Sequence, residues 1–458
     1  MEWAAARAYV SWSHPAEPNL HFLRLVPALA LVGATSACQT TSPLLRAGAE
    51  PDTGLMMRDV RLLSSDALEG RGTGTPGNDS ARVFIARRFT DLRLRPVLAE
   101  SGCASMTCAP TFVQPFTARM SGAERHGLRA SLATANVAAV IEGSDPQLKG
   151  QIVVLGAHYD HLGRQAFGAR DPNLPDAIRN GADDNASGVA AVLELARLLR
   201  RNPPKRSIAL VTFSAEELGL LGSEYFVSHS PFPLDSVQAM LNFDMVGRLR
   251  DDKLMVYGTA TATELPAVVT GANTGAPFRL NAVGDGEGPS DHAAFYRKNI
   301  PVLHFFTDAH EDYHKSTDDA DKINGAGMRR VVAYAERITR ALADRPSRLT
   351  FVRAPATASR TGPSSRAGPQ PWLGSVPDMG ASEIPGLRLS SVTAGSPADK
   401  AGLRPGDVVV ELAGQPVVDL QSYSDALYSR KPGDVVAVVV RRGAERLTLS
   451  VTLGQRGG

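Results

Sequence analysis

The sequence predicts an α/β fold with a mostly parallel sheet flanked by helices, followed by a small β-rich domain. Between residues 136 and 306, short apolar runs typical of buried strands alternate with segments whose apolar residues recur at helical spacing. Such alternation indicates parallel strands with helices covering both faces of the sheet. Residues 351–371, rich in Pro, Ala, Ser, Thr and Gly, are interpreted as a linker. The segment 372–456 is the small β-rich domain.

Four apolar runs account for the predicted sheet. They are residues 152–155, 207–213, 240–243 and 301–306. Residues 189–199 carry apolar side chains at helical spacing and form the helix expected between the first two strands. Nearer the N-terminus, residues 58–94 are expected to be helical with a break at residues 70–77. A polar tether is expected before them, over residues 39–57.

A G-x-G-x-x-G match at Gly72, Gly74 and Gly77 lies inside that break. Dinucleotide-binding loops of this type follow a strand and open a helix. Here the match follows a helical segment and contains Pro76, so we interpret it as a loop between two helices.

Composition and charge narrow the range of functions. The 458-residue chain is 43% apolar and 21% charged, which is ordinary for globular proteins, and it is long enough for two or three domains. Its formal net charge is only +2. A net charge so close to zero does not indicate the basic surface that binds nucleic acid, so we expect no nucleic-acid partner.

Residues 1–38 are predicted to be an export segment. Arg24 precedes the apolar run 25–32, which is too short to span a bilayer but suits a signal peptide. The small residues 34–37 then resemble the approach to a bacterial lipoprotein processing site at Cys38. We expect a periplasmic or envelope location. The alternatives are a lipid on Cys38, which would anchor the chain to the outer membrane, and plain cleavage nearby.

The remaining cysteines, Cys103 and Cys108, flank a short loop. In an exported chain they would face an oxidising compartment, where they would form either a small disulfide or two free thiols. The sequence leaves both alternatives open.

Histidine and carboxylate residues lie just beyond the predicted strand ends, where open α/β sheets place their ligands. They are His158, Asp184, Glu216, Glu217, Asp244 and His314. Two histidines with three carboxylate positions, the adjacent Glu216 and Glu217 being counted as one, suit a borderline metal such as zinc. A carboxylate shared between two ions can hold them roughly 3.5–4 Å apart. The sequence therefore predicts a metal centre at this edge of the sheet.

Five runs resemble the motifs of the family-28 metallopeptidases, the co-catalytic zinc aminopeptidases. They are Gly-Ala-His-Tyr-Asp at 156–160, Gly-Ala-Asp-Asp-Asn-Ala-Ser-Gly at 181–188, Ala-Glu-Glu-Leu-Gly-Leu-Leu-Gly-Ser at 215–223, Asn-Phe-Asp-Met at 242–245 and Tyr-His at 313–314. The resemblance covers roughly residues 58–345 and implies a zinc exopeptidase-like catalytic domain, which we place at residues 39–350.

The resemblance implies a ligand set for two Zn²⁺ ions. Asp184 would bridge both ions. His158 and Asp244 would complete one site, and Glu217 and His314 the other. Asp183 is the alternative to Asp184, and counting back from Ser187-Gly188 in the family pattern favours Asp184. Family members also carry a non-proline cis peptide after this Asp, so we expect one between Asp184 and Asn185.

The resemblance also implies catalytic roles. Glu216 would be the general base that takes a proton from the attacking water and returns it to the departing amine. Asp160 would orient His158. Tyr313 would donate its hydroxyl to the developing oxyanion, and its alternative role is aromatic packing. His161, His292 and His304 are expected to be structural.

One competing motif is the H-E-x-x-H match at residues 310–314, the signature of zincin peptidases. That signature needs a regular helix to bring both histidines to one face. Here it follows a strand almost directly and lacks apolar periodicity, so we place His310 and Glu311 in a loop near the substrate cleft. No G-x-S-x-G elbow is present to support a serine hydrolase.

The C-terminal segment resembles a PDZ domain of the bacterial envelope-protease type, most clearly over residues 395–407. This resemblance implies that Leu373 and Gly374 offer backbone N–H groups to the C-terminal carboxylate of a bound peptide. The alternative is a domain that only packs on the catalytic unit.

The predicted function is hydrolysis of peptides with a free N-terminus by a two-zinc aminopeptidase. Carboxypeptidase or dipeptidase action at the same site is the first alternative, and a peptide-binding protein that acts through its PDZ domain is the second. A cyclase acting on N-terminal glutamine is disfavoured because the full two-metal ligand set is present.

Overall fold

The computed structural model describes most of the chain after residue 49. The described residues are 50–99, 110–119, 130–165, 168–171, 174, 176–275, 277–354, 371–377, 386–393, 395–417, 422–423, 426–427 and 429–455. The predicted export segment, Cys38, Cys103, Cys108 and most of the predicted linker lie outside them. Within the described part, no helix is both long and apolar enough to cross a membrane.

Nine strands of the described residues form one mixed sheet with the order β1-β5-β7-β6-β8-β11-β9-β10, and β4 pairs with β5. Its centre is parallel and consists of the four predicted strands: β6 (Ile152–His158), β7 (Ser207–Phe213), β8 (Val237–Phe243) and β11 (Val302–Phe306). The mostly parallel expectation is confirmed for this centre. Antiparallel pairs, β5 with β7 and β9 with β11, extend the sheet on both sides.

The outer strands have no counterpart in the sequence prediction. They are β1 (Arg95–Pro96), β4 (Val113–Arg119), β5 (Ser131–Ile141), β9 (Lys253–Tyr257) and β10 (Arg279–Ala282). A separate small pair joins β2 (Leu98–Ala99) to β3 (Pro110–Thr111).

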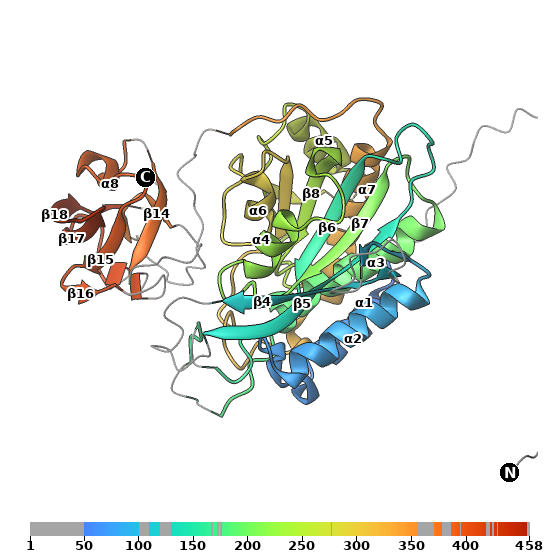
Figure 1. Cartoon of the computed structure of the whole chain (residues 1–458), viewed down its shortest axis with the longest axis horizontal. Helices are drawn as coiled ribbons and strands as arrows, with labels where there is room; N and C mark the ends of the chain where they lie inside the picture. The colour runs from blue at the N-terminus through green and yellow to red at the C-terminus, as the bar shows by residue number, and fades with distance from the viewer. Residues whose placement is uncertain are drawn as a thin grey trace, which may run out of the picture. The chain divides into compact units, whose positions relative to one another are not determined.

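Alternate residues of the central strands belong to two apolar cores, one on each face of the sheet. Figure 1 shows the helices around this sheet. Val153 and Leu155 pack in one core, and Ile152 and Val154 pack in the other. The first core includes α1 (Thr53–Leu63), α2 (Pro76–Asp91), α3 (Gly188–Arg201), α5 (Leu265–Ala272) and α7 (Gly325–Asp344). The second includes α4 (Leu221–Ser228) and α6 (His292–Tyr296). Helices therefore cover both faces, as predicted.

The N-terminal helices confirm the predicted break and correct the predicted tether. α1 begins at Thr53, where the Asp52 side chain accepts the backbone N–H of Leu55, so residues 53–57 are helical rather than part of a tether. The short helix η1 (Asp66–Arg71) and the glycine-containing loop separate α1 from α2, which begins at Pro76 after the cap residue Thr75. Shorter helical turns are η3 (Ala182–Ser187), η4 (Leu234–Ser236) and η5 (Ala320–Lys322).

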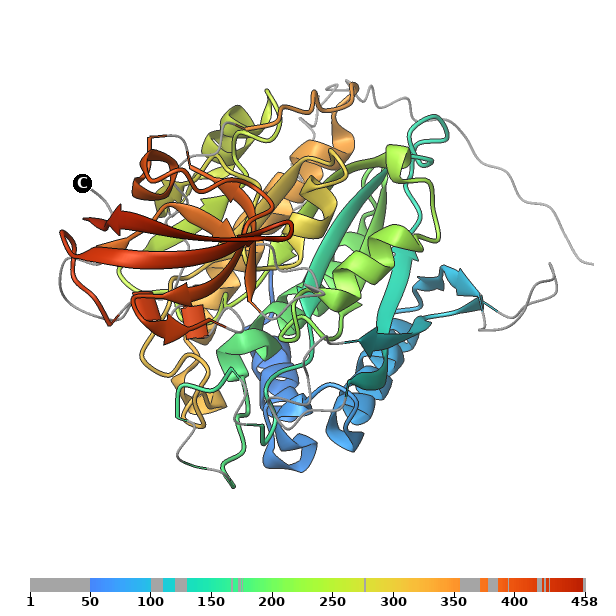
Figure 2. The same cartoon turned by 60° about the vertical axis from the view of Figure 1, so that its left-hand side comes forward.

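The C-terminal domain is a small antiparallel β structure, as expected (drawn in red in Figure 2). Its main sheet contains β13 (Ser375–Pro377), β14 (Leu387–Val392), β15 (Val408–Leu412), β16 (Gln415–Pro416), β17 (Val435–Arg442) and β18 (Glu445–Thr452). The helix α8 (Pro397–Lys400) and the pair of β12 (Pro371–Trp372) with β19 (Gly454–Gln455) complete it. Its apolar core contains only residues between Leu373 and Leu453.

Candidate metal centre

The parallel strands bring the predicted site residues to one edge of the sheet. His158 is the last residue of β6, and Asp244 directly follows β8. Asp184 lies in the turn η3 before α3. Glu217 follows β7, and His314 lies in a turn after β11. Since β7, β6, β8 and β11 are parallel neighbours, their carboxyl ends meet here.

Asp184 stands between the two histidines. Its Oδ1 lies 3.3 Å from His158 Nε2, and its Oδ2 lies 3.1 Å from His314 Nε2. His158 Nε2 is also 3.4 Å from Asp244 Oδ1, and His314 Nε2 is 3.2 Å from Glu217 Oε2. The cluster therefore has two halves that share one carboxylate.

These separations suit ligands of zinc. Two donors that each lie about 2.0–2.2 Å from one tetrahedral ion are about 3.4 Å apart. Asp244 Oδ1 is buried and has no hydrogen-bond partner among the described residues, as a ligand atom aimed at an ion would. His158, Glu216 and Asp244 also offer ligand atoms within 4.8 Å of one another, and so do His158, Asp184 and Glu217. The donor set fits a zinc pair.

The structure places Asp184, and not Asp183, in the cluster. Asp183 Oδ1 accepts the backbone N–H of Gly247 at 2.7 Å, and Asp183 Oδ2 lies 3.1 Å from His310 Nε2. The peptide between Asp184 and Asn185 is cis, as the resemblance implied.

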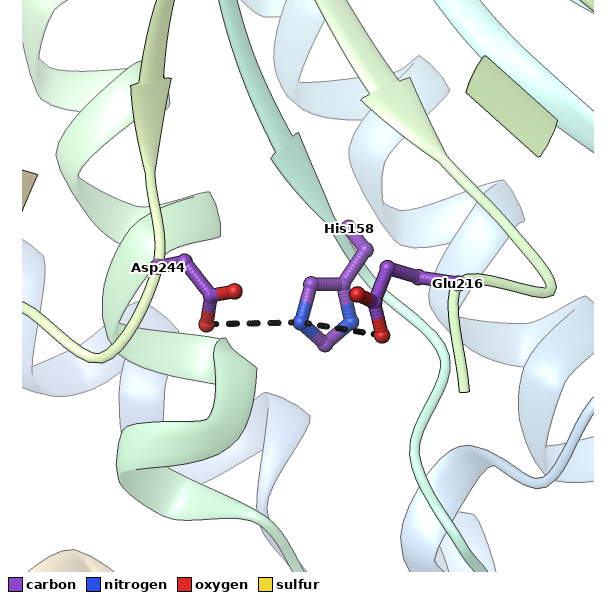
Figure 3. A group of neighbouring side chains, drawn as sticks. All are labelled: His158, Glu216 and Asp244. Atoms are coloured by element: carbon purple, nitrogen blue, oxygen red, sulfur yellow. Dashed lines mark ion pairs between the residues drawn. The ribbon is translucent and has the colours of Figure 1, made fainter. Parts of the chain in front are cut away.

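Glu216 lies beside His158, with its Oε2 3.9 Å from His158 Nε2 (Figure 3). The backbone N–H of Glu216 donates to Asp160 Oδ1 at 3.1 Å, and Thr73 Oγ1 donates to Asp160 Oδ2 at 3.0 Å. His158 Nδ1 is 3.1 Å from the backbone oxygen of Asp160 but 3.8 Å from its carboxylate. Asp160 thus contacts His158 through its backbone oxygen. The Asp160 carboxylate instead accepts the backbone N–H of Glu216.

The pKa values of the two adjacent glutamates are shifted in opposite directions. Burial raises the pKa of Glu216 well above its usual range, despite the opposing influence of His158. Burial acts on Glu217 too, but His314 and His161 outweigh it and lower the pKa of Glu217 to about 2. Glu216 therefore binds a proton more readily than Glu217 does.

Two further contacts were not identified from the sequence. Ser290 Oγ donates to Asp244 Oδ2 at 2.7 Å, which leaves Asp244 Oδ1 directed at His158. Asp318 Oδ2 accepts the backbone N–H groups of Asp183 and Asp184 at 2.9 and 3.1 Å. Both residues lie in loops, and no role was predicted for either.

His161, which was expected to be structural, lies in the cluster. Its Nδ1 is 2.6 Å from Glu217 Oε1. The one signal in the sequence was its position three residues after His158 in the same loop.

The structure contradicts the zincin interpretation of residues 310–314. These residues form turns rather than a helix. His310 faces Asp183, whereas His314 faces Asp184 and Glu217, so the two histidines do not share a site. Glu311 is exposed.

A cavity of about 100 Å³ opens beside the cluster. Its polar wall includes His158, Glu216 and Tyr313, whose ring stacks on that of His314 with centroids 3.8 Å apart. Its apolar wall includes Met255, Tyr257 and Phe306. Among the described residues that line it, none is a lysine or an arginine.

Comparisons with known proteins match two parts of the chain. The family model of peptidase family M28 matches residues 136–339, and that of the PDZ domain matches residues 371–453. Leupeptin-inactivating enzyme 1 of Streptomyces exfoliatus is 33% identical over 193 residues, 42% of this chain and 39% of that protein. Aminopeptidase YwaD of Bacillus subtilis is 34% identical over 158 residues, 34% of this chain and 31% of that protein. The chain thus spans less than half the length of either relative.

A solved structure also resembles part of this chain. The aminopeptidase from Aneurinibacillus sp. strain AM-1 covers 66% of this chain and 96% of its own, with 18% identity and a TM-score of 0.51. At that identity the likeness shows a shared fold.

Proposed function

We propose that this chain, whose residues 136–339 belong to peptidase family M28 and whose residues 371–453 form a PDZ domain, is a zinc aminopeptidase that removes N-terminal residues from peptides. The observation that carries the proposal is the carboxylate of Asp184, whose two oxygens face His158 and His314. A shared carboxylate between two ligand pairs is what a two-zinc site requires.

The five donors His158, Asp184, Glu217, Asp244 and His314 would hold the two ions. When bound, zinc would polarise the scissile carbonyl and raise the acidity of the attacking water. The protein's own contribution is to keep these donors in place in a largely buried cluster.

Glu216 would carry the proton. Its raised pKa suits a group that takes a proton from water and later gives it to the leaving amine. The carboxylate of Asp160 fixes the backbone of Glu216 and so the direction of its side chain. Tyr313 lines the same cavity, where its hydroxyl would donate to the carbonyl oxygen as negative charge develops there.

The charge of the cavity favours an aminopeptidase over a carboxypeptidase. Of the cavity's acidic residues, Asp184 and Asp244 are assigned to zinc, which leaves Glu216 and Asp308 to face a free N-terminal amine, which is cationic. A carboxypeptidase needs a cation for the substrate's carboxylate, and no lysine or arginine is among the described lining residues.

Matched substrates test this proposal. The zinc-loaded chain should hydrolyse a leucyl-anilide and should not hydrolyse the N-acetylated form, and chelation should abolish the activity. Hydrolysis of the acetylated substrate, or release of C-terminal residues from an acetylated peptide, would contradict it.

The PDZ domain is proposed to bind the C-terminus of a peptide, with affinity near micromolar, about −8 kcal/mol. Leu373 is buried and Gly374 has a positive φ of 83°, which suits the tight turn that a carboxylate-binding loop needs. Fluorescence titration with a C-terminal peptide and its amidated form should show binding of the free acid alone. Equal binding of both forms would sink the idea.

Export remains a proposal based on residues 1–38. Fractionation of cells that express the full chain and a Cys38→Ser variant tests it. The wild-type chain should appear in the cell envelope. Loss of membrane association in the variant would support a lipid attached to Cys38. Cytoplasmic retention of both chains would contradict export.

A further inference from the structure

We propose that His161 is a positioning residue that fixes which oxygen of Glu217 faces His314, and so shapes one half of the metal centre. The inference rests on the proposed two-zinc function. It adds a residue to that site which was expected to have no role there.

The two oxygens of the Glu217 carboxylate face different histidines. His161 Nδ1 lies 2.6 Å from Oε1, while His314 Nε2 lies 3.2 Å from Oε2. An ionised carboxylate only accepts hydrogen bonds, so His161 Nδ1 carries the proton. With Oε1 occupied in this way, Oε2 is the oxygen left for an ion shared with His314.

Packing alone does not explain an imidazole at position 161. The side chain is fully buried, and its Nε2 has no hydrogen-bond partner among the described residues. A buried polar atom without a partner is unfavourable, and an apolar side chain would fill the space without that cost. The charge-assisted hydrogen bond to Glu217 is the compensating contact.

The surroundings hold the ring in place without any help from a metal. The backbone N–H of His161 donates to the backbone oxygen of Arg71 at 3.3 Å. Gly181 has a positive φ of 58°, and a Cβ there would lie 2.5 Å from His161 Cγ and Cδ2. The ring also packs edge-on against His314, with centroids 5.7 Å apart. These contacts fix the ring of His161, and through it the carboxylate of Glu217.

Zinc affinity, measured by competition with a chromophoric chelator, tests the proposal on the full chain. His161→Asn places an amide N–H near the position of Nδ1, whereas His161→Gln places one near Nε2. His161→Phe keeps the ring and removes both nitrogens. The matched control is His310→Asn, because the carboxylate that His310 faces belongs to Asp183, outside the cluster.

We expect His161→Gln and His161→Phe to weaken zinc binding at the half formed by Glu217 and His314 by about 10–100-fold, the usual effect of removing a partner of a metal ligand. His161→Asn should recover most of that loss, and His310→Asn should bind as wild type does. When Glu217 is also replaced by Gln, the variants with Asn and Gln at position 161 should have the same zinc affinity.

Wild-type zinc affinity in both His161→Gln and His161→Phe would overturn the proposal, and so would equal losses in the Asn and Gln variants. Neither result would contradict the proposed function, because both concern only the role of His161. A wild-type chain that binds fewer than two zinc ions would instead contradict the proposed function itself.

Discussion

Carboxylate groups surround His158 and His314, and these set the charge of both imidazoles in the zinc-free protein. Burial alone would lower the two pKa values, but the neighbouring carboxylates outweigh it and raise both well above 6.5. Zinc binds neutral imidazole, so zinc must displace these protons.

The stability of the zinc-free protein should therefore fall as pH rises. Each histidine has a folded-state pKa above its unfolded value, so its stabilising contribution is complete below about pH 6.5 and is lost as pH climbs through the folded-state value. Unfolding temperatures measured with chelator between about pH 6 and pH 9 should show this decline. The zinc-loaded protein should lack it, because the ions replace the protons. Zinc-free stability that rises across the range would contradict this.

At the residue scale, the sequence predicts the proposed zinc ligands but not the residues that hydrogen-bond to them. His158, Asp184 and His314 stand in motifs with fixed spacing, so a local pattern is enough to find them. Ser290 and His161 act through side-chain hydrogen bonds across the fold, and 46 and 56 residues separate them from their partners. No local pattern records such contacts.

At the scale of elements, the start of α3 depends on a close backbone approach. A Cβ at Gly188 would lie 2.2 Å from the backbone oxygen of Phe243 and 2.3 Å from Asn185 Oδ1. The Asn185 side chain joins the two elements, because its Nδ2 donates to Phe243 and its Oδ1 accepts from Gly188. Gly188 thus lets the turn that carries Asp184 lie against the end of β8.

Gly188→Ala should therefore destabilise the protein by about 1–3 kcal/mol, the usual cost of an overpacked core. Denaturant unfolding of the zinc-loaded chain measures this. Gly150→Ala is the matched control, because nothing lies within 4 Å of a Cβ there. Equal stability of the two variants would show that the close approach is unimportant.

The central strands β6, β7 and β8 could be predicted because each is rich in apolar residues and is buried along its whole length. β5 could not, since its sequence SLATANVAAVI is rich in alanine and contains an asparagine, which have low strand propensity. Its strand form comes from pairing with β4, β7 and β1. Tertiary pairing here overrides local preference.

At the scale of the whole molecule, the two folded domains have separate apolar cores. One lies entirely within residues 373–453, and the cores of the catalytic domain draw on earlier residues. The metal centre belongs to the catalytic domain. Zinc binding should therefore stabilise one domain and leave the other unchanged.

Calorimetry should accordingly show two unfolding transitions, and chelation of zinc should lower the midpoint temperature of only one of them. Zinc present at about 1,000 times its Kd adds about 4 kcal/mol of stability, so its removal should shift that transition by several degrees. The transition that does not move should also appear in a separately expressed C-terminal domain. A single transition that moves as a whole would contradict independent domains.

The central claim is that Glu216 carries the proton at a two-zinc centre, and its most direct test is kcat with zinc content for Glu216→Gln. Glu311→Gln is the matched control, since Glu311 is exposed and outside the cavity lining. We expect Glu216→Gln to lower kcat by about 10²–10⁴-fold with both zinc ions retained. Glu311→Gln should stay near wild type. An active Glu216→Gln variant, or an inactive Glu311→Gln variant with one bound zinc, would contradict the account.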